Sequence, residues 1–136
     1  MLDRLVALES GADDDDRKQL DDAIDDLARS LTPSRWLDAS HLRADAGPDV
    51  FEDEKGAVIR LRQLLHNGAS AFDDGVLAEL IDRILGADRA LAVAAIKDGK
   101  GGEALDELAK ADREAAKGNE ISAIEHYRLA WERAQD

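Results

Sequence analysis

The sequence contains no cysteine and few aromatic residues, and both absences limit what the protein can be. Without cysteine, the chain can form neither a disulfide framework nor a thiolate metal site. Aromatic residues make up 4% of the 136 residues, so leucine, isoleucine, valine and alanine must supply most of the core. The apolar share of 44% is ordinary for a globular protein, and the length suits a single domain.

Positive charge is also scarce. The chain has 18 lysine and arginine residues against 31 acidic residues, which gives a formal net charge of −13. Such a surface repels phosphate groups, so we expect no binding of nucleic acid or of anionic membranes. The acidity has two explanations that stay open: a salty or calcium-bearing environment, or the composition of a GC-rich genome.

Long apolar runs and leader features are missing as well. No run approaches the roughly 18 residues of a membrane span, so we expect no membrane insertion. The N-terminal stretch MLDRLVALESGADDDD has neither the basic region nor the apolar region of a signal peptide. If the protein is exported, we expect this chain to be a piece of a larger one.

Apolar residues recur at helical spacing along the whole chain, and no stretch shows the two-residue alternation of a strand. We expect a short first helix within residues 1–12 that could serve as a linker, and a second helix ending before Thr32-Pro33. Thr32 should cap a short helical turn after Pro33. Further helices should begin at Pro48 and span about 74–98, 103–117 and 120–135. The predicted fold is all-α: one domain over 1–136, a bundle of about five or six helices.

The end of the chain predicts an antiparallel αα-hairpin, residues 103–136, because only Gly118-Asn119 separate its two helices. The second of these helices carries small and aromatic residues at regular spacing: Ala123, Tyr127, Ala130 and Trp131. With Gly118, this pattern resembles the second half of a tetratricopeptide repeat. A solenoid needs about three stacked units, and no second copy is visible, so the hairpin should pack on the upstream helices.

A second resemblance covers most of the chain from about residue 16. The residues that carry it in the first half are Ser30, Leu31, Pro33, Trp36, Asp38, Ser40, His41, Leu42, Gly47, Val50, Phe51, Glu54, Lys55, Ala57 and Val58. Those in the second half are Ala87, Asp88, Leu91, Ala92, Ala95, Ile96, Asp98, Ala123, Ile124, His126, Tyr127, Ala130 and Trp131. The pattern resembles small helical modules toward the C-terminal ends of large secreted or surface-associated bacterial and archaeal multidomain proteins. This family has no assigned activity, so the resemblance implies a location outside the cell and an accessory role.

These observations favour a non-enzymatic helical module that gives stability, spacing or protein–protein contact in a larger exported protein. Its partners would be other domains of that protein or a partner protein, and the oligomeric state stays open. The alternative is a free-standing intracellular adaptor that holds a peptide on its tetratricopeptide-like hairpin. Exposed apolar, asparagine or lysine side chains in a groove on the hairpin would favour the adaptor, and a covered hairpin would favour the module. We predict no cofactor and no metal.

Asp38, Ser40 and His41 raise a third alternative, a hydrolase, because they lie close together in the sequence. A hydrolase would require a pocket that brings His41 or His126 near an acid. A catalytic triad usually draws its members from distant segments, so we expect Asp38 and Ser40 to cap helical turns and His41 to form a local hydrogen bond. His66 falls at a helix end and His126 points partly outward. The three histidines have no metal-ligand spacing.

Two loops could be mistaken for ligand sites. Asp13–Asp16 lacks the alternation and the glycine of a calcium loop, so we expect a solvated acidic loop. Asp98–Glu103 contains lysine and glycine but not in the order of a phosphate-binding loop.

Asp88 lies on the apolar face of the long helix, and a buried acid needs a partner. We expect a hydrogen bond or ion pair with another helix, for example with Tyr127 or an arginine, and a binding-pocket acid is the alternative. Trp36 and Trp131 should pack in the core. If the domain acts by contact, the candidate surface is the first helix, which would join a preceding domain or pair two copies. Its apolar residues are Leu2, Leu5, Val6 and Leu8.

Overall fold

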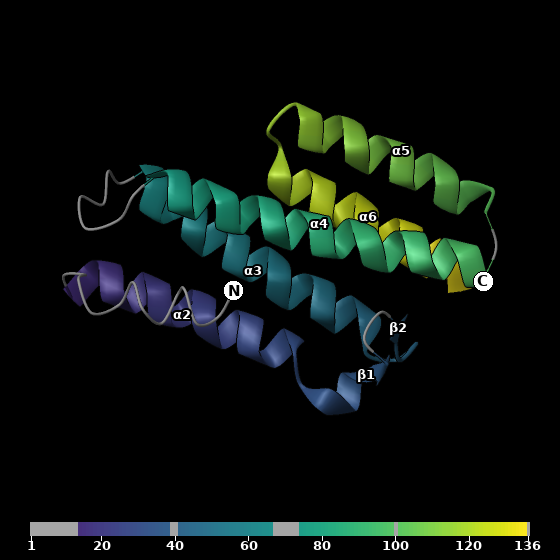
Figure 1. Ribbon diagram of the computed structural model, residues 1–136, viewed down its shortest axis with the longest axis horizontal. Coiled ribbons are helices and arrows are strands. Elements are labelled where there is room, and N and C mark those ends of the chain that lie inside the picture. Colours follow the sequence, from purple (N-terminus) through teal and green to yellow (C-terminus); the bar gives the residue numbers. More distant parts are fainter. Residues whose placement is uncertain (1–13, 39–40, 67–73, 100, 136) are drawn as a thin grey trace.

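The computed structural model describes residues 14–38, 41–66, 74–99 and 101–135. Its elements are α2 (Asp14–Ser30), the 3₁₀ turn η1 (Pro33–Arg35), β1 (Trp36–Asp38), β2 (His41–Leu42), α3 (Gly47–His66), α4 (Asp74–Asp98), α5 (Glu103–Ala116) and α6 (Glu120–Gln135). The prediction of an all-α bundle is confirmed, because five helices make up most of the described chain (Figure 1). The predicted first helix lies outside the described residues.

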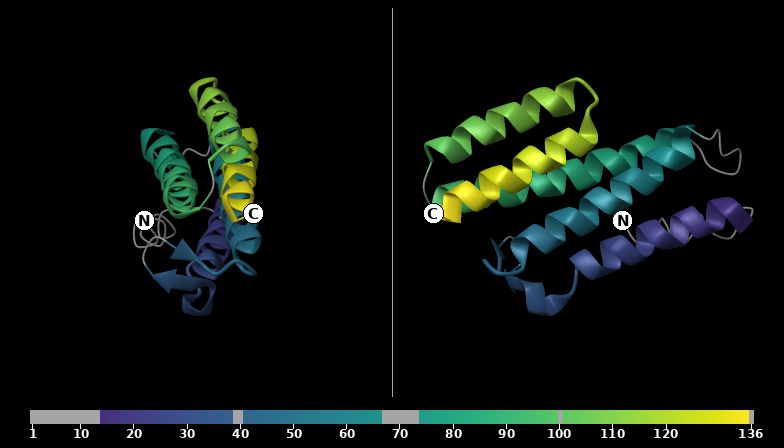
Figure 2. Two further views of the ribbon diagram at one scale, coloured as in Figure 1. Left: turned by 90° about the vertical axis from the view of Figure 1, so that its right-hand side faces the viewer. Right: turned by 180° about the vertical axis from the view of Figure 1, so that it is seen from behind.

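Helices α3 and α6 occupy the middle of the bundle (Figure 2). α3 packs against α2, α4 and α6, and α6 packs against α3, α4 and α5. α5 lies beside α6 and runs in the opposite direction (Figure 1). Leucine dominates the interior, with fully buried side chains from α2, α3 and α4: Leu20, Leu61, Leu64, Leu77 and Leu80. The long helix α4 contacts α3, α5, α6 and β2.

Trp131 joins α6 to α3. Its side chain is 3% exposed, and its ring centroid lies 6.1 Å from that of Phe51, with the planes tilted by 55°. A Cβ added at Gly47 would lie 2.2 Å from the six-membered ring of Trp131, so the close approach of this ring requires a glycine. Several residues of the resemblance therefore belong to one packing contact.

Residues 32–42 differ from the prediction of a helical turn. Helical geometry is limited to Pro33–Arg35, and β1 and β2 then pair antiparallel, with Trp36 opposite Leu42. We call this two-stranded segment, Trp36–Leu42, the ribbon. The prediction of no strand is wrong here, because strands of two or three residues are too short to show an alternating pattern.

The ribbon is attached to α2 by hydrogen bonds that the sequence did not reveal. The indole N–H of Trp36 donates to the carbonyl oxygen of Ser30 at 2.8 Å. Thr32 stands at the N-cap position of η1 but does not cap it, because its hydroxyl donates back to the Arg29 carbonyl at 2.8 Å. The ribbon is thus held against the end of α2 by its tryptophan.

Gly56 lies in the middle of α3, where glycine costs roughly 1 kcal/mol relative to alanine. The helix nevertheless continues through it. A Cβ at this position would lie 2.7 Å from a carboxylate oxygen of Asp26 on α2. The glycine therefore lets α2 approach α3 closely.

The charge of −13 predicts that salt stabilises the fold. Opposite charges are paired in places, as for Lys55 and Glu125 at 2.7 Å, but 13 acidic charges remain without a matching base. Screening their repulsion should raise the melting temperature by several degrees between about 10 mM and about 1 M NaCl. Thermal unfolding followed by circular dichroism at constant pH measures this, with an uncharged osmolyte as control. A melting temperature that falls with salt would mean that the ion pairs outweigh the repulsion.

Candidate functional site

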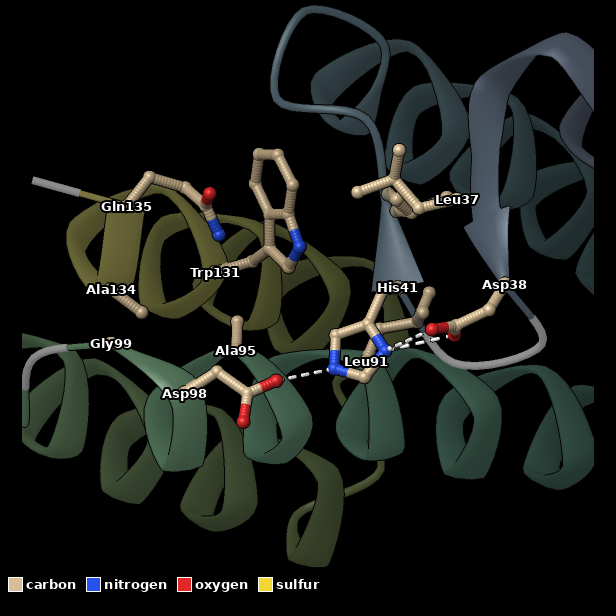
Figure 3. A pocket seen from close by; sticks show the side chains of 11 residues that line it. Leu37, Asp38, His41, Leu91, Ala95, Asp98, Gly99, Trp131, Ala134 and Gln135 are labelled. Atoms are coloured by element: carbon tan, nitrogen blue, oxygen red, sulfur yellow. Dashed lines mark hydrogen bonds and ion pairs between the residues drawn. The ribbon is translucent and has the colours of Figure 1, made fainter.

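A pocket of about 470 Å³ opens between the ribbon, the C-terminal end of α4 and the C-terminal end of α6 (Figure 3). Its apolar walls include Leu37 of β1, Leu91 of α4 and Trp131 of α6. Three ionisable groups, Asp38, His41 and Asp98, line the same space. The pocket exists because the ribbon lies across the end of α4, which brings together segments far apart in the chain.

His41 is held between two aspartates at this pocket. Its Nδ1 lies 2.8 Å from Oδ1 of Asp38, and its Nε2 lies 2.5 Å from Oδ2 of Asp98 (Figure 3). The hydrogen bond with Asp38, followed by the one with Asp98, raises the pKa of His41 above its usual value. The imidazole thus ties the ribbon to the end of α4, and its charged form is favoured.

This arrangement meets the condition for the hydrolase alternative, because the pocket brings His41 near two acids. A general base needs a ring nitrogen that can take a proton from the attacking group. Both nitrogens of His41 already face carboxylates, so neither is available for that role. The predicted local hydrogen bond of His41 is present, but Asp38 lies in a strand and does not cap a helical turn. Ser40 lies outside the described residues.

The contact between His41 and Asp98 was not predicted. The two residues are 57 positions apart. The sequence places Asp98 in the resemblance pattern and at the start of a loop that lacks the order of a phosphate site, and neither points to His41. The signal that could have identified it is the position of Asp98 as the last residue of the long helix. The spacing of apolar residues does not show, however, which other segment of the chain lies across the end of a helix.

Of the other two histidines, His126 does not line this pocket. Nδ1 of His126 on α6 lies 2.7 Å from Oε2 of Glu107 on α5, so this side chain joins two neighbouring helices. The side chain of His66 lies outside the described part of the chain. Within the described residues, no group of three or more histidines and acids is arranged to hold a metal ion.

Tyr127 is buried, and its hydroxyl donates to Oδ1 of Asp112 on α5 at 2.8 Å. Nε of Arg89 on α4 donates to the same oxygen at 2.9 Å, and this hydrogen bond lowers the pKa of Asp112. Burial, together with the hydrogen bond to Asp112, raises the pKa of Tyr127. The three side chains connect α4, α5 and α6.

Asp88 is fully buried, and neither of its carboxyl oxygens has a hydrogen-bond partner among the described residues. The prediction of a partner such as Tyr127 or an arginine is wrong, because Tyr127 and the adjacent Arg89 both bond to Asp112. Successive helical residues point about 100° apart, so Arg89 faces solvent where Asp88 faces the interior. Asp88 does not line the pocket either.

Replacing Asp88 by asparagine is expected to stabilise the protein by about 1–3 kcal/mol at neutral pH, because it removes an acid that is buried without a partner. Asp82→Asn is the matched control, since Asp82 is exposed on the same helix and loses the same charge. Urea unfolding of the three proteins at pH 7 measures the difference. A loss of stability in Asp88→Asn alone would show that the carboxylate has a favourable partner, such as a buried water.

Apolar side chains reach solvent on and beside the ribbon. Leu37 is 72% exposed and Leu31, just before the ribbon, is 54% exposed. A shallower hollow of about 270 Å³ is lined by Leu31, Pro33, Trp36 and Asp38. Trp36 is therefore half-buried at the edge of the core rather than inside it. We call Leu31, Pro33, Trp36 and Leu37 the ribbon surface.

The contact surface predicted from the sequence was the first helix. Its residues Leu2, Leu5, Val6 and Leu8 lie outside the described residues, so that prediction stays a prediction. The ribbon surface was missed because the sequence predicts Leu31 on the apolar face of the second helix and Leu37 in a short helical turn. Leu31 instead falls just beyond the last residue of α2, and Leu37 falls in a strand.

Comparisons with protein-family models, with curated proteins and with solved structures find no match to this chain. The geometry of the site therefore carries the functional argument. Among the described helices, none combines the length and the apolarity needed to cross a membrane.

Proposed function

We propose that this chain is a non-enzymatic helical module of a larger exported protein, and that it makes contact with another domain or protein through the ribbon surface. The observation that carries this proposal is the exposure of Leu37 and Leu31 side by side with two hollows. Single exposed leucines are common on proteins, but several apolar groups gathered around a concave surface are typical of a contact site.

The non-enzymatic part of the proposal rests on His41. Both of its nitrogens are engaged with carboxylates, and the sequence has no cysteine to act as an alternative nucleophile. The pocket is therefore suited to binding a group and not to transferring a proton from one. The accessory role and the location outside the cell follow the resemblance described above.

The module is favoured over the intracellular adaptor by the packing of α6. A tetratricopeptide-like adaptor would need one face of its terminal helices open for a peptide. On α6, six side chains are buried among α3, α4 and α5: Ala123, Ile124, Tyr127, Ala130, Trp131 and Ala134. This face of α6 is covered, although Leu105 of α5 is 51% exposed. The ribbon end gathers more exposed apolar groups than the hairpin does, so it is the better place for contact.

A photo-crosslinking experiment tests the proposed contact. The photoreactive amino acid p-benzoylphenylalanine replaces Leu37 in the full-length protein expressed in its native cell, and the adducts are mapped by mass spectrometry. We expect one dominant adduct to a single segment of another domain or protein. The control places the same group at Asp106, which is exposed on α5. No adduct from position 37, or the same scattered adducts from both positions, would overturn the proposal.

A further inference from the structure

The pocket beside the ribbon contains a hydrogen-bond donor for which no described residue supplies an acceptor. The six-membered ring of Trp131 packs toward Gly47 and Phe51, and its five-membered ring faces the pocket (Figure 3). Among the described residues the indole N–H has no hydrogen-bond acceptor, and it is open to solvent through the pocket. A largely buried tryptophan usually finds an acceptor for this group. The acceptor here must come from outside the described chain.

The opposite side of the pocket offers acceptors for a cation. Asp98 uses Oδ2 for His41, and its Oδ1 makes no hydrogen bond. Asp38 adds a second carboxylate on the other side of His41. When His41 is protonated, these three groups still carry one net negative charge. The overall charge of −13 also attracts basic segments to this surface.

Between these polar groups the pocket is apolar. Leu37 and Leu91 line it together with Ala95, so an aliphatic stem can lie along them while a charged end stays near the rim. The volume of about 470 Å³ falls in the range of pockets that bind small groups. The pocket is therefore complementary to a side chain with an apolar stem and a cationic end, next to a hydrogen-bond acceptor.

We infer that this pocket receives an arginine side chain of the contacting partner. The aliphatic stem lies between Leu37 and Leu91, the guanidinium bonds to the carboxylate of Asp98, and a backbone carbonyl of the partner accepts the N–H of Trp131. Arginine fits better than lysine because its planar group presents several donors at fixed angles to a carboxylate. This inference rests on the proposed function and names the chemistry of its partner.

The two tryptophans of the chain supply a direct test by NMR. Only the indole N–H of Trp131 faces the pocket, whereas that of Trp36 is bonded to Ser30 and serves as an internal control. The probe is N-acetyl-arginine methylamide, which has a guanidinium and carbonyl acceptors. We expect the Trp131 indole signal to move saturably, with a dissociation constant on the order of 1 mM, while the Trp36 signal stays in place.

Three variants sharpen the test. Asp98→Asn should weaken binding of the probe by about tenfold, because it removes the charge that bonds the guanidinium. Leu37→Ser, at an exposed position, should weaken binding a few-fold without a loss of stability. Asp106→Asn removes the same charge at an exposed residue that does not line the pocket, and it should leave binding unchanged. An unshifted Trp36 signal in each variant confirms that the fold is kept.

Three outcomes would overturn the inference. The first is no movement of the Trp131 signal up to roughly 20 mM probe. The second is equal weakening by Asp98→Asn and Asp106→Asn, which would mean general attraction by the acidic surface. The third is equal binding of N-acetyl-leucine methylamide, which would make the pocket simply apolar. If any of these outcomes occurs together with a specific crosslink from position 37, the proposed contact stands. Only the inference that an arginine enters the pocket is then rejected.

Discussion

Replacing Trp131 by alanine is expected to lower the free energy of unfolding by about 3–5 kcal/mol. The indole is 3% exposed and fills the space between α6 and α3, against Phe51 and Gly47. Truncation removes its buried area and leaves a cavity that this contact cannot close. Urea unfolding followed by circular dichroism measures the loss. Leu105→Ala is the control, because Leu105 is 51% exposed on α5 and should change stability by less than about 0.5 kcal/mol.

The same contact can be examined from its other side. Gly47→Ala places a methyl group on the ring of Trp131, and we expect it to cost about 1–3 kcal/mol. In the Trp131→Ala background the methyl group enters the vacated space, so Gly47→Ala should cost much less there. Equal costs in both backgrounds would contradict the packing described. A chain that lacks residues 103–136 should lose stability. If it unfolded cooperatively with unchanged stability, that result would also contradict the packing.

Glu54 is expected to make the protein less stable as the pH rises. Its side chain is 6% exposed on α3, and its Oε2 has no hydrogen bond. Burial, followed by the negative charge of Asp53, raises the pKa of Glu54 to about 8. In the unfolded chain the pKa of this group lies near its ordinary value of 4.5. The folded state therefore binds the proton more tightly between these two values.

This difference in pKa decides how stability changes with pH. Stability contributed by the neutral carboxyl is fully present below about pH 4.5 and is lost as the pH rises through about 8. Each unit of pKa difference corresponds to about 1.4 kcal/mol, so the loss amounts to several kcal/mol at most. Glu54→Gln should remove this dependence and stabilise the protein above neutral pH.

Urea unfolding between about pH 5 and pH 9 measures the effect as the difference between variant and parent. Subtracting the parent's free energy of unfolding from the variant's removes the effect of the general repulsion among acidic groups, which also grows with pH. Glu52→Gln, an exposed change of the same charge two residues away, should run parallel to the parent. A Glu54→Gln curve that also runs parallel to the parent would mean that this carboxyl is already ionised in the folded protein.

The helices could be predicted because their apolar residues repeat over many turns. The long helix was expected at about 74–98 and spans Asp74–Asp98, and the last was expected at 120–135 and spans Glu120–Gln135. Burial of Trp131 also followed from its position on an apolar face. Periodicity carries this information because one face of each helix must pack.

The site could not be predicted to the same degree. The ribbon rests on two very short strands, and its contact with α4 depends on where a helix end meets a distant loop. The prediction of a partner for Asp88 is wrong for a related reason. The sequence indicates that Asp88 faces inward, but not that Arg89 and Tyr127 meet on Asp112 instead. Which side chains meet depends on how the helices are placed relative to one another. The spacing of residues within one helix does not give that placement.

The proposed non-enzymatic role depends most on the engagement of His41 by two carboxylates, and an NMR titration of its ring protons tests this directly. We expect the pKa of His41 to lie above its usual value, because hydrogen bonds with Asp38 and Asp98 favour the imidazolium. Asp98→Asn should lower it, and Asp106→Asn should leave it unchanged. A His41 that titrates at the usual value and does not respond to Asp98→Asn would contradict the account. Its imidazole would then be available as a base, and the hydrolase alternative would return.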